Sequence, residues 1–254
     1  MVQAQPPTKT LQELIMAAHF RAPLTLSVLD LADWVDHFSD HPIVQYLPTI
    51  PQANLPQLGA PQMSLEMISP IALPRILLRS PDGRYSLQLQ GDRFALGWAR
   101  IEPVGVPAEY PGFEAMLERW TVVLSRFEQW TEERFQLRLK HRLVEINYAN
   151  AAPLEHDGQR KRISEIFRFL HLKGRSVIGF NANWVERIYS GDQAIGTVSA
   201  AVGLGQVPPE TSVVAFNFIG MAEVAENQES KHIMKEVHGK IREVYESAIV
   251  ADAH

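Results

Sequence analysis

Two closely spaced turns between Ile76 and Ile101 constrain the fold of this chain more than any other feature. Residues 80–83 (Ser-Pro-Asp-Gly) have the composition of a tight turn, in which proline presets φ and glycine accepts a positive φ. Polar and apolar residues then alternate over 85–90, and residues 91–92 (Gly-Asp) are typical of a two-residue hairpin turn that begins with glycine. A second alternating stretch follows. The pattern therefore predicts an antiparallel meander.

Apolar residues at helical spacing predict three helices outside this meander. The first follows Ser27, whose spacing to Asp30 resembles a capping box, and is expected to end before the helix-breaking Pro42. The second runs from Phe113 to about Arg134, and the third covers 233–249. Further strands are predicted at 14–20, 141–149, 178–184, 195–202 and 213–219. We therefore expect an α+β fold, with an antiparallel sheet, helices on one face and two similar strand/helix halves.

The order of these elements suggests two portions. Residues 1–150 are expected to form a strand-helix-meander-helix-strand portion, and residues 151–254 a portion of three strands and a C-terminal helix, unless both belong to one domain. The segment 42–74 holds seven of the 17 prolines and has no sustained period. Long segments of this kind are either functional or laid along a surface. We expect an extended segment pinned onto the core, and the alternative is a mobile lid.

Composition excludes several classes of protein. The chain has no cysteine, so disulfides, thiolate zinc sites, iron–sulfur clusters and cysteine nucleophiles are absent. A hydrophobic content of 46% with a net charge of −5 is typical of a globular protein. The first ten residues do not resemble a signal peptide, and the weakly polar stretch 194–207 is too short to cross a membrane. We expect a cytoplasmic protein that does not bind membranes.

A family resemblance rests on residues 87–94 (LQLQGDRF), on Trp98 and on the stretches 110–114 (YPGFE) and 145–150 (EINYAN). Over about residues 75–150 the chain resembles a sporadically distributed, uncharacterised bacterial family of similar length. The resemblance implies a bacterial cytosolic accessory protein and a link to defence or toxin–antitoxin loci. It carries over no catalytic residue. The chain departs from the family pattern at Asn217, where an acidic residue is expected.

His141, Glu145 and Asn147 share one strand face if the strand alternates regularly. His141 and Glu145 would lie about 13 Å apart, too far for direct proton transfer. Glu145 and Asn147 would lie about 7 Å apart and are a candidate binding pair for one polar ligand. The alternative is a polar face exposed to solvent or to the segment 42–74.

Motifs for catalysis, cofactors and metals are missing. There is no nucleophile elbow and no phosphate-binding loop, and the glycines at 203–205 do not complete a dinucleotide fingerprint. His37 and His41 have an i, i+4 spacing, but the glutamate of a zinc protease motif is replaced by Phe38. We therefore expect no catalytic residue, no cofactor and no metal site, although an enzyme is not excluded.

A basic segment in the middle of the chain is the strongest functional signal. The segment from Arg134 to Arg175 contains ten Lys/Arg and four Asp/Glu, so its net charge is +6. The rest of the chain contains 14 basic and 25 acidic residues and has a net charge of −11. Such a segment favours phosphate or an acidic partner surface. The alternative is a solvated loop. The candidate binding residues in it are Arg160, Lys161, Arg162, Arg168, His171, Lys173 and Arg175.

Two aromatic residues, Phe167 and Phe169, lie among these charges. They are expected either to stack on bases or to anchor the loop to the core. From all these features we expect a non-catalytic protein that binds a macromolecular partner or an anionic ligand, or associates with itself. One alternative is nucleic-acid binding or RNA processing through the segment 134–175, with His141 or His171 as an acid/base. A second is a small-molecule sensor with a pocket between meander and helices, capped by the segment 42–74.

Overall fold

The computed structural model describes residues 10–50, 53–55, 74–104, 106, 108–156, 159–160, 166–167, 180–207 and 211–249. Its helices are α1 (Val28–His37), α2 (Phe113–Phe135) and α4 (Ser230–Ala248). Its strands are β1 (Leu11–Phe20), β2 (Ile43–Leu47), β3 (Arg75–Arg79), β4 (Tyr85–Gln90), β5 (Arg93–Ala99), β6 (His141–Pro153), β7 (Glu155–His156), β8 (Gln159–Arg160), β9 (Asn181–Ser190), β10 (Gln193–Val207) and β11 (Thr211–Glu223).

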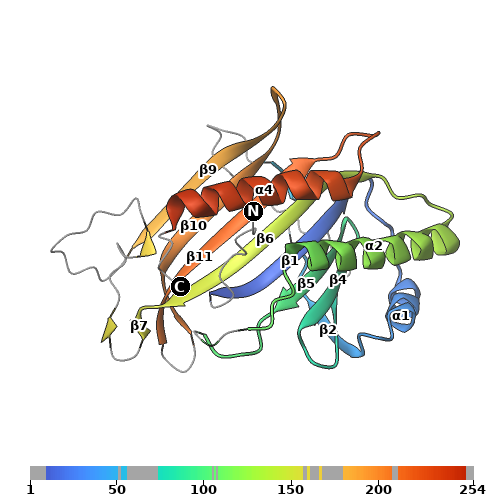
Figure 1. Ribbon diagram of the computed structural model, residues 1–254. Helices are drawn as coiled ribbons and strands as arrows, with labels where there is room; N and C mark the ends of the chain where they lie inside the picture. Colours follow the sequence, from blue (N-terminus) through green and yellow to red (C-terminus); the bar gives the residue numbers. More distant parts are fainter. Residues whose placement is uncertain are drawn as a thin grey trace.

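Nine of these strands form one antiparallel sheet in the order β2-β3-β4-β5-β1-β6-β11-β10-β9. Strands β7 and β8 form a separate two-stranded ribbon. Figure 1 shows α2 and α4 lying across one face of the large sheet, with α1 beside the end of α2. The predicted α+β fold with an antiparallel sheet and helices on one face is confirmed.

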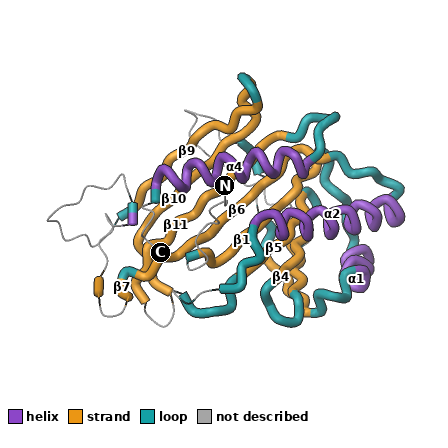
Figure 2. The backbone as a smooth tube through the Cα atoms, in the orientation of Figure 1, coloured by secondary structure: helices purple, strands orange, loops and turns teal. Residues whose placement is uncertain are grey.

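The sheet consists of two halves with a similar strand order, although the first half has α1 and the additional edge strand β2 between β1 and β3. In the first half, β1 pairs with β5, the last strand of a meander ordered β5-β4-β3, and α2 follows. In the second half, β6 pairs with β11, the last strand of a meander ordered β11-β10-β9, and α4 follows. The halves join where β1 pairs with β6. Because β1 and β6 are antiparallel, this arrangement is an approximate internal two-fold repeat, and Figure 2 shows β1 and β6 side by side at its centre with α2 and α4 following the two meanders.

The meander predicted at 76–101 forms as β3, β4 and β5, and the turn after β3 has Gly83 at φ +75°. The second turn also forms at residues 91–92, but Gly91 does not adopt a positive φ. Glycine is needed there for a different reason. A Cβ atom on Gly91 would lie 2.9 Å from the carbonyl oxygen of Leu24, whose amide bonds to the Gly91 carbonyl.

The helix-covered face of the sheet carries the hydrophobic core. Phe94 of β5 stacks on Phe127 of α2 with ring centroids 4.4 Å apart. Gly220 of β11 lies under α4, where an added Cβ would approach Val237 to 2.5 Å. In α1 the predicted capping box between Ser27 and Asp30 is present. Burial of these apolar faces is the main force that holds both helices onto the sheet.

Candidate ligand-binding face

The other face of the large sheet, turned away from α2 and α4, is called here the open face. Side chains alternate between the two faces of a strand. In β1, Met16, Ala18 and Phe20 belong to the hydrophobic core, and the alternating side chains of Ala17 and His19 lie on the open face. Antiparallel sheets often expose such a face to solvent. Here Ala17 and His19 are 0% and 2% exposed, so the centre of the open face is buried.

Three charged or ionisable side chains from neighbouring strands meet at this centre. Nε2 of His19 in β1 donates to Oε2 of Glu145 in β6 at 2.8 Å. Nη2 of Arg93 in β5 donates to the other carboxylate oxygen at 3.2 Å. The side chains of His19, Arg93 and Glu145 are 2%, 6% and 12% exposed. One carboxylate therefore links three adjacent strands across the join between the halves.

The ionised form of Glu145 is stabilised by these neighbours. Burial favours the neutral acid, but the hydrogen bond from His19 and the positive charge of Arg93 outweigh it and hold the pKa of Glu145 below its ordinary value. The second imidazole nitrogen, Nδ1 of His19, is buried and has no hydrogen-bond partner within the described part of the chain.

Arg75 and Arg79 of β3, with Arg93 of β5, form the arginine cluster of the open face. Arg75 donates to the side-chain oxygen of Gln88 at 3.0 Å. The Nε atom of each of the three arginines is buried and lacks a hydrogen-bond partner among the described residues. Arg79 makes no ion pair there within 4.0 Å.

A second acidic residue, Glu13 of β1, lies within the electrostatic reach of the arginine cluster. Burial raises the pKa of Glu13, and the charges of Arg79, Arg75 and Arg93 oppose this without cancelling it. Glu13 is therefore an incomplete counter-charge. The arginine cluster holds three guanidinium groups against one firmly ionised carboxylate, Glu145, and one weakened carboxylate.

Small residues give the long arginine side chains room on this face. In the pairing of β4 with β5, Gln88 faces Ala95 and Ser86 faces Gly97, and Ala95 in turn faces Ala17 of β1. A Cβ atom on Gly97 would lie 2.5 Å from the hydroxyl of Ser86. Larger side chains at these positions would fill the space that the guanidinium groups approach.

The described parts of the segment 42–74 contact this region of the sheet. The backbone of Ile50 exchanges two hydrogen bonds with the side chain of Gln90, at 2.9 and 2.8 Å. The carbonyl of Ala53 accepts from Arg142. The described residues of this segment are thus pinned at two points, which agrees with the expectation of an extended segment laid on the core. Residues 51–52 and 56–73 lie outside the described residues, so the choice between a pinned segment and a lid is not tested there.

One sequence prediction about this region is wrong. The pairing of β1 with β6 skips Arg142, and the alternation of side chains reverses across such a bulge. His141 therefore points toward the helices, where its Nδ1 lies 2.6 Å from the hydroxyl of Ser230. Glu145 and Asn147 do share the open face, but Glu145 is already engaged. The side-chain oxygen of Asn147 is buried without a hydrogen-bond partner among the described residues.

The basic segment is only partly described. Lys161, Arg162, Arg168, His171, Lys173 and Arg175 lie outside the described residues, and for Arg160 only the backbone in β8 is described. Three of the four described basic residues near its start contact separate partners: Arg134 pairs with Asp30, Lys140 with Glu226, and Arg142 donates to the carbonyl of Ala53. The fourth, Arg138, is exposed.

Two further sequence hypotheses find a place in the structure. Phe167 is fully buried and packs edge-on against Phe216, so it anchors its loop to the core, while Phe169 lies outside the described residues. His41 is 5% exposed and sits beyond the end of α1, 3.3 Å from Asp40. His41 and His37 therefore do not face one another across a helix turn.

The open face gathers residues that sequence reasoning did not select, namely Glu13, His19, Arg75, Arg79 and Arg93. The only sequence feature that marks these residues is that they are polar residues alternating with apolar ones within largely apolar strands. This signal did not reveal the site, because the site is assembled from several strands and the sequence does not show which strands are neighbours.

No family model matches the chain, and none of the curated proteins compared with it matches either. The resemblance over residues 75–150 therefore stays a prediction. Within the described residues, no helix has the length and apolar character needed to span a bilayer, and no group of three or more His, Asp or Glu side chains is arranged to hold a metal ion.

Proposed function

We propose that this chain is a non-catalytic binding protein that holds an anionic group, a phosphate or a carboxylate, on the arginine cluster of its open face. The observation that carries the proposal is the set of unpartnered, buried Nε atoms on Arg75, Arg79 and Arg93. The cytoplasmic setting and a protein or self-association partner, both predicted from the sequence, belong to the same proposal.

The physical argument concerns charge. A buried guanidinium group is costly unless it is paired and hydrogen-bonded. In the described residues Arg93 pairs with Glu145, Arg75 reaches only the neutral amide of Gln88, and Arg79 has no carboxylate partner. An oxyanion would supply both the missing charge and acceptors for the free N–H groups, because guanidinium groups present planar, paired donors to phosphate and carboxylate.

A second candidate function, acid–base catalysis, is favoured by the contact of His19 with Glu145. A carboxylate that fixes an imidazole through one nitrogen leaves the other nitrogen available as a base. Binding is favoured over catalysis because Glu145 is shared with Arg93, and because the described residues place no nucleophile beside Nδ1 of His19. Turnover of a substrate that is lost in His19→Gln but kept in Arg79→Gln would reverse this preference.

Anion binding is tested by heat unfolding in phosphate and in chloride at equal ionic strength, with titration calorimetry of inorganic phosphate. A ligand at a hundred times its Kd stabilises the folded state by about 2.7 kcal/mol. For a chain of this size we expect a rise in Tm of roughly 5–10 °C in phosphate. The variant Arg79→Gln should lose the rise, because Arg79 has no competing ion pair in the described residues.

The matched control is Arg187→Gln, which removes an exposed arginine from β9 on the other half of the sheet. It should keep the full phosphate effect. Equal stabilisation of both variants, or no effect of phosphate and of citrate on the unmodified protein, contradicts the proposal. Binding of a nucleic acid that weakens steeply with salt and survives Arg79→Gln would instead support the basic segment 134–175 as the binding element.

A further inference from the structure

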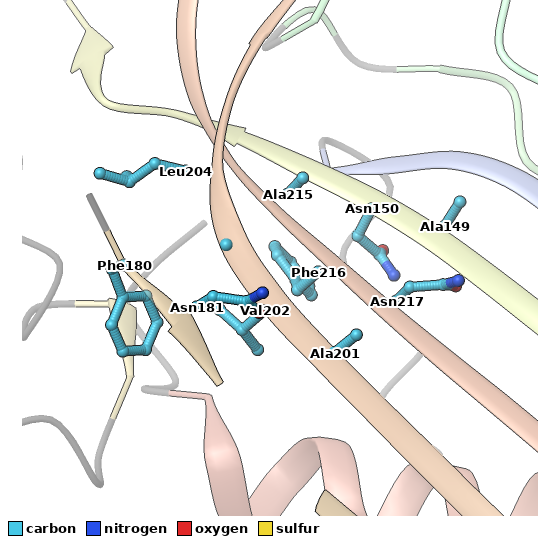
Figure 3. A pocket seen from close by; sticks show the side chains of 11 residues that line it. Ala149, Asn150, Phe180, Asn181, Ala201, Val202, Leu204, Ala215, Phe216 and Asn217 are labelled. Atoms are coloured by element: carbon cyan, nitrogen blue, oxygen red, sulfur yellow. The ribbon is translucent and has the colours of Figure 1, made fainter. Parts of the chain in front are cut away.

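A hollow lies on the second half of the open face, away from the arginine cluster. Its volume is about 360 Å³, which falls within the range of small-molecule sites. Figure 3 shows its lining side chains, which come from β6, β9, β10 and β11 and from Phe180 just before β9. The lining residues are Ala149, Asn150, Phe180, Asn181, Ala201, Val202, Gly203, Leu204, Ala215, Phe216 and Asn217.

The floor of the hollow is flat because small residues fall side by side in the strand register. Ala149 of β6 pairs with Asn217 of β11, which pairs with Ala201 of β10. In the next row, Ala215 of β11 pairs with Gly203 of β10. Ala201 and Ala215 are exposed, although they lie within the sheet. A planar group can therefore approach the backbone of three strands closely.

The polar groups of the hollow are carboxamides. The side-chain oxygen of Asn217 is buried and has no hydrogen-bond partner among the described residues. Asn181 is exposed on β9, and the ring of Phe180 lies beside it (Figure 3). None of the described lining residues carries a charge. The unsatisfied oxygen of Asn217 is costly as long as it lacks an N–H or O–H donor.

We propose that this hollow is a binding site for an uncharged planar heterocycle that presents an N–H donor to Asn217. A carboxamide offers one acceptor and two donors and so matches a ring edge that carries a neighbouring donor and acceptor. The small floor residues accept the flat face of the ring, and Phe180 supplies an aromatic wall. The absence of charge among the described lining residues separates this site from the arginine cluster. The inference does not depend on the proposed anion site.

The test uses three neutral probes, adenosine, uridine and nicotinamide, with binding measured by calorimetry and by ligand-observed NMR. We expect at least one probe to bind. Ala201→Leu places a larger side chain on the floor and should abolish binding of that probe. Asn217→Ala should weaken it about tenfold, the effect of losing one hydrogen bond of ordinary strength.

The control is Ser199→Leu, which lies on the same strand and face as Ala201 but does not line the hollow. This variant should bind the probe as the unmodified protein does, and circular dichroism checks that all three variants are folded. The proposal is overturned if no probe binds at millimolar concentration, or if Ala201→Leu binds as tightly as Ser199→Leu. Loss of probe binding in Arg79→Gln would also contradict it, because the arginine cluster would then be the site.

Discussion

The two halves of the sheet share a strand order and a final helix but differ in the chemistry of the open face. The first half carries Arg75, Arg79 and Arg93 with their partial counter-charges. The second half carries asparagines among alanines and glycines, represented by Asn217 and Ala201. On the opposite face both halves pack aromatic and aliphatic residues under a long helix.

The comparison shows how a repeated fold divides its faces. The face of the sheet that packs against the helices must carry apolar side chains, so the residues on that face are of the same kind in both halves. The open face has no such demand, and its residues are free to differ. The first and third predictions below concern residues of the open face, near the arginine cluster and in the second half, and the second prediction concerns the helix-covered face.

The largest expected difference is between Glu145, on the open face at the join between the halves, and Glu186 of the edge strand β9, which pairs with Lys240 of α4. Glu145→Ala leaves Arg93 buried without a carboxylate and His19 without its acceptor, and should lower the free energy of unfolding by about 3 kcal/mol or more. Glu186→Ala in β9 removes only a half-exposed ion pair with Lys240 and should cost less than about 1 kcal/mol. Urea unfolding measures both. Similar costs for the two variants would show that the buried carboxylate of Glu145 contributes no more than an ordinary ion pair at the sheet edge.

The second prediction concerns the contact between the two helices. His238 of α4 stacks on Phe113 of α2, with ring centroids 3.6 Å apart, and its Nδ1 lies 3.1 Å from the hydroxyl of Tyr148. Burial, aided by the positive charge of Arg242 and partly opposed by Glu114, lowers the pKa of His238 to about 4. The unfolded chain, with an ordinary histidine pKa of about 6.5, therefore binds the proton more readily than the folded one.

The contribution of neutral His238 to the free energy of unfolding is fully present above about pH 6.5. It falls by up to about 3 kcal/mol as the pH is lowered from 6.5 to 4. His238→Gln cannot ionise, and its amide oxygen can still accept from the hydroxyl of Tyr148. This variant should flatten the dependence of unfolding free energy on pH between 4 and 6.5. The control His232→Gln alters an exposed histidine paired with Glu236 at 3.7 Å and should keep the slope. An unchanged slope in His238→Gln would refute the prediction.

The smallest expected effect lies in the second half. Asn217→Ala removes a buried oxygen that has no hydrogen-bond partner among the described residues, so nothing stabilising is lost. Because a buried oxygen without a donor destabilises the folded state, we expect the free energy of unfolding to stay the same or to rise, and any loss to stay below about 0.5 kcal/mol. A loss comparable to that of Glu145→Ala would show that the second half also depends on its open face.

The elements could be predicted from local patterns. The turns at 80–83 and 91–92, the capping box at Ser27 and the apolar stripe of α2 each report on neighbouring residues, and all are present. The site could not be predicted in this way. His19 and Glu145 are 126 residues apart and meet only through the pairing of β1 with β6.

The prediction that His141 shares a face with Glu145 was wrong for a related reason. The bulge at Arg142 reverses the alternation of side chains between the two faces of β6, and the sequence carries no sign of it. The charge count of the basic segment likewise did not reveal that Arg134 pairs with Asp30 of α1. Charge totals describe a stretch of chain, whereas a binding surface depends on which strands and helices lie side by side.

The central place of β1 has a consequence for how the chain acquires its structure. One edge of β1 bonds to β5 and the other to β6, whose partner residues are synthesised much later. A growing chain can complete the first meander while one side of β1 still lacks its neighbour, and an unpaired strand edge invites pairing with the wrong segment. Protection of that edge during synthesis, by a chaperone or by rapid elongation through residue 153, would decide how much of the protein reaches its native form.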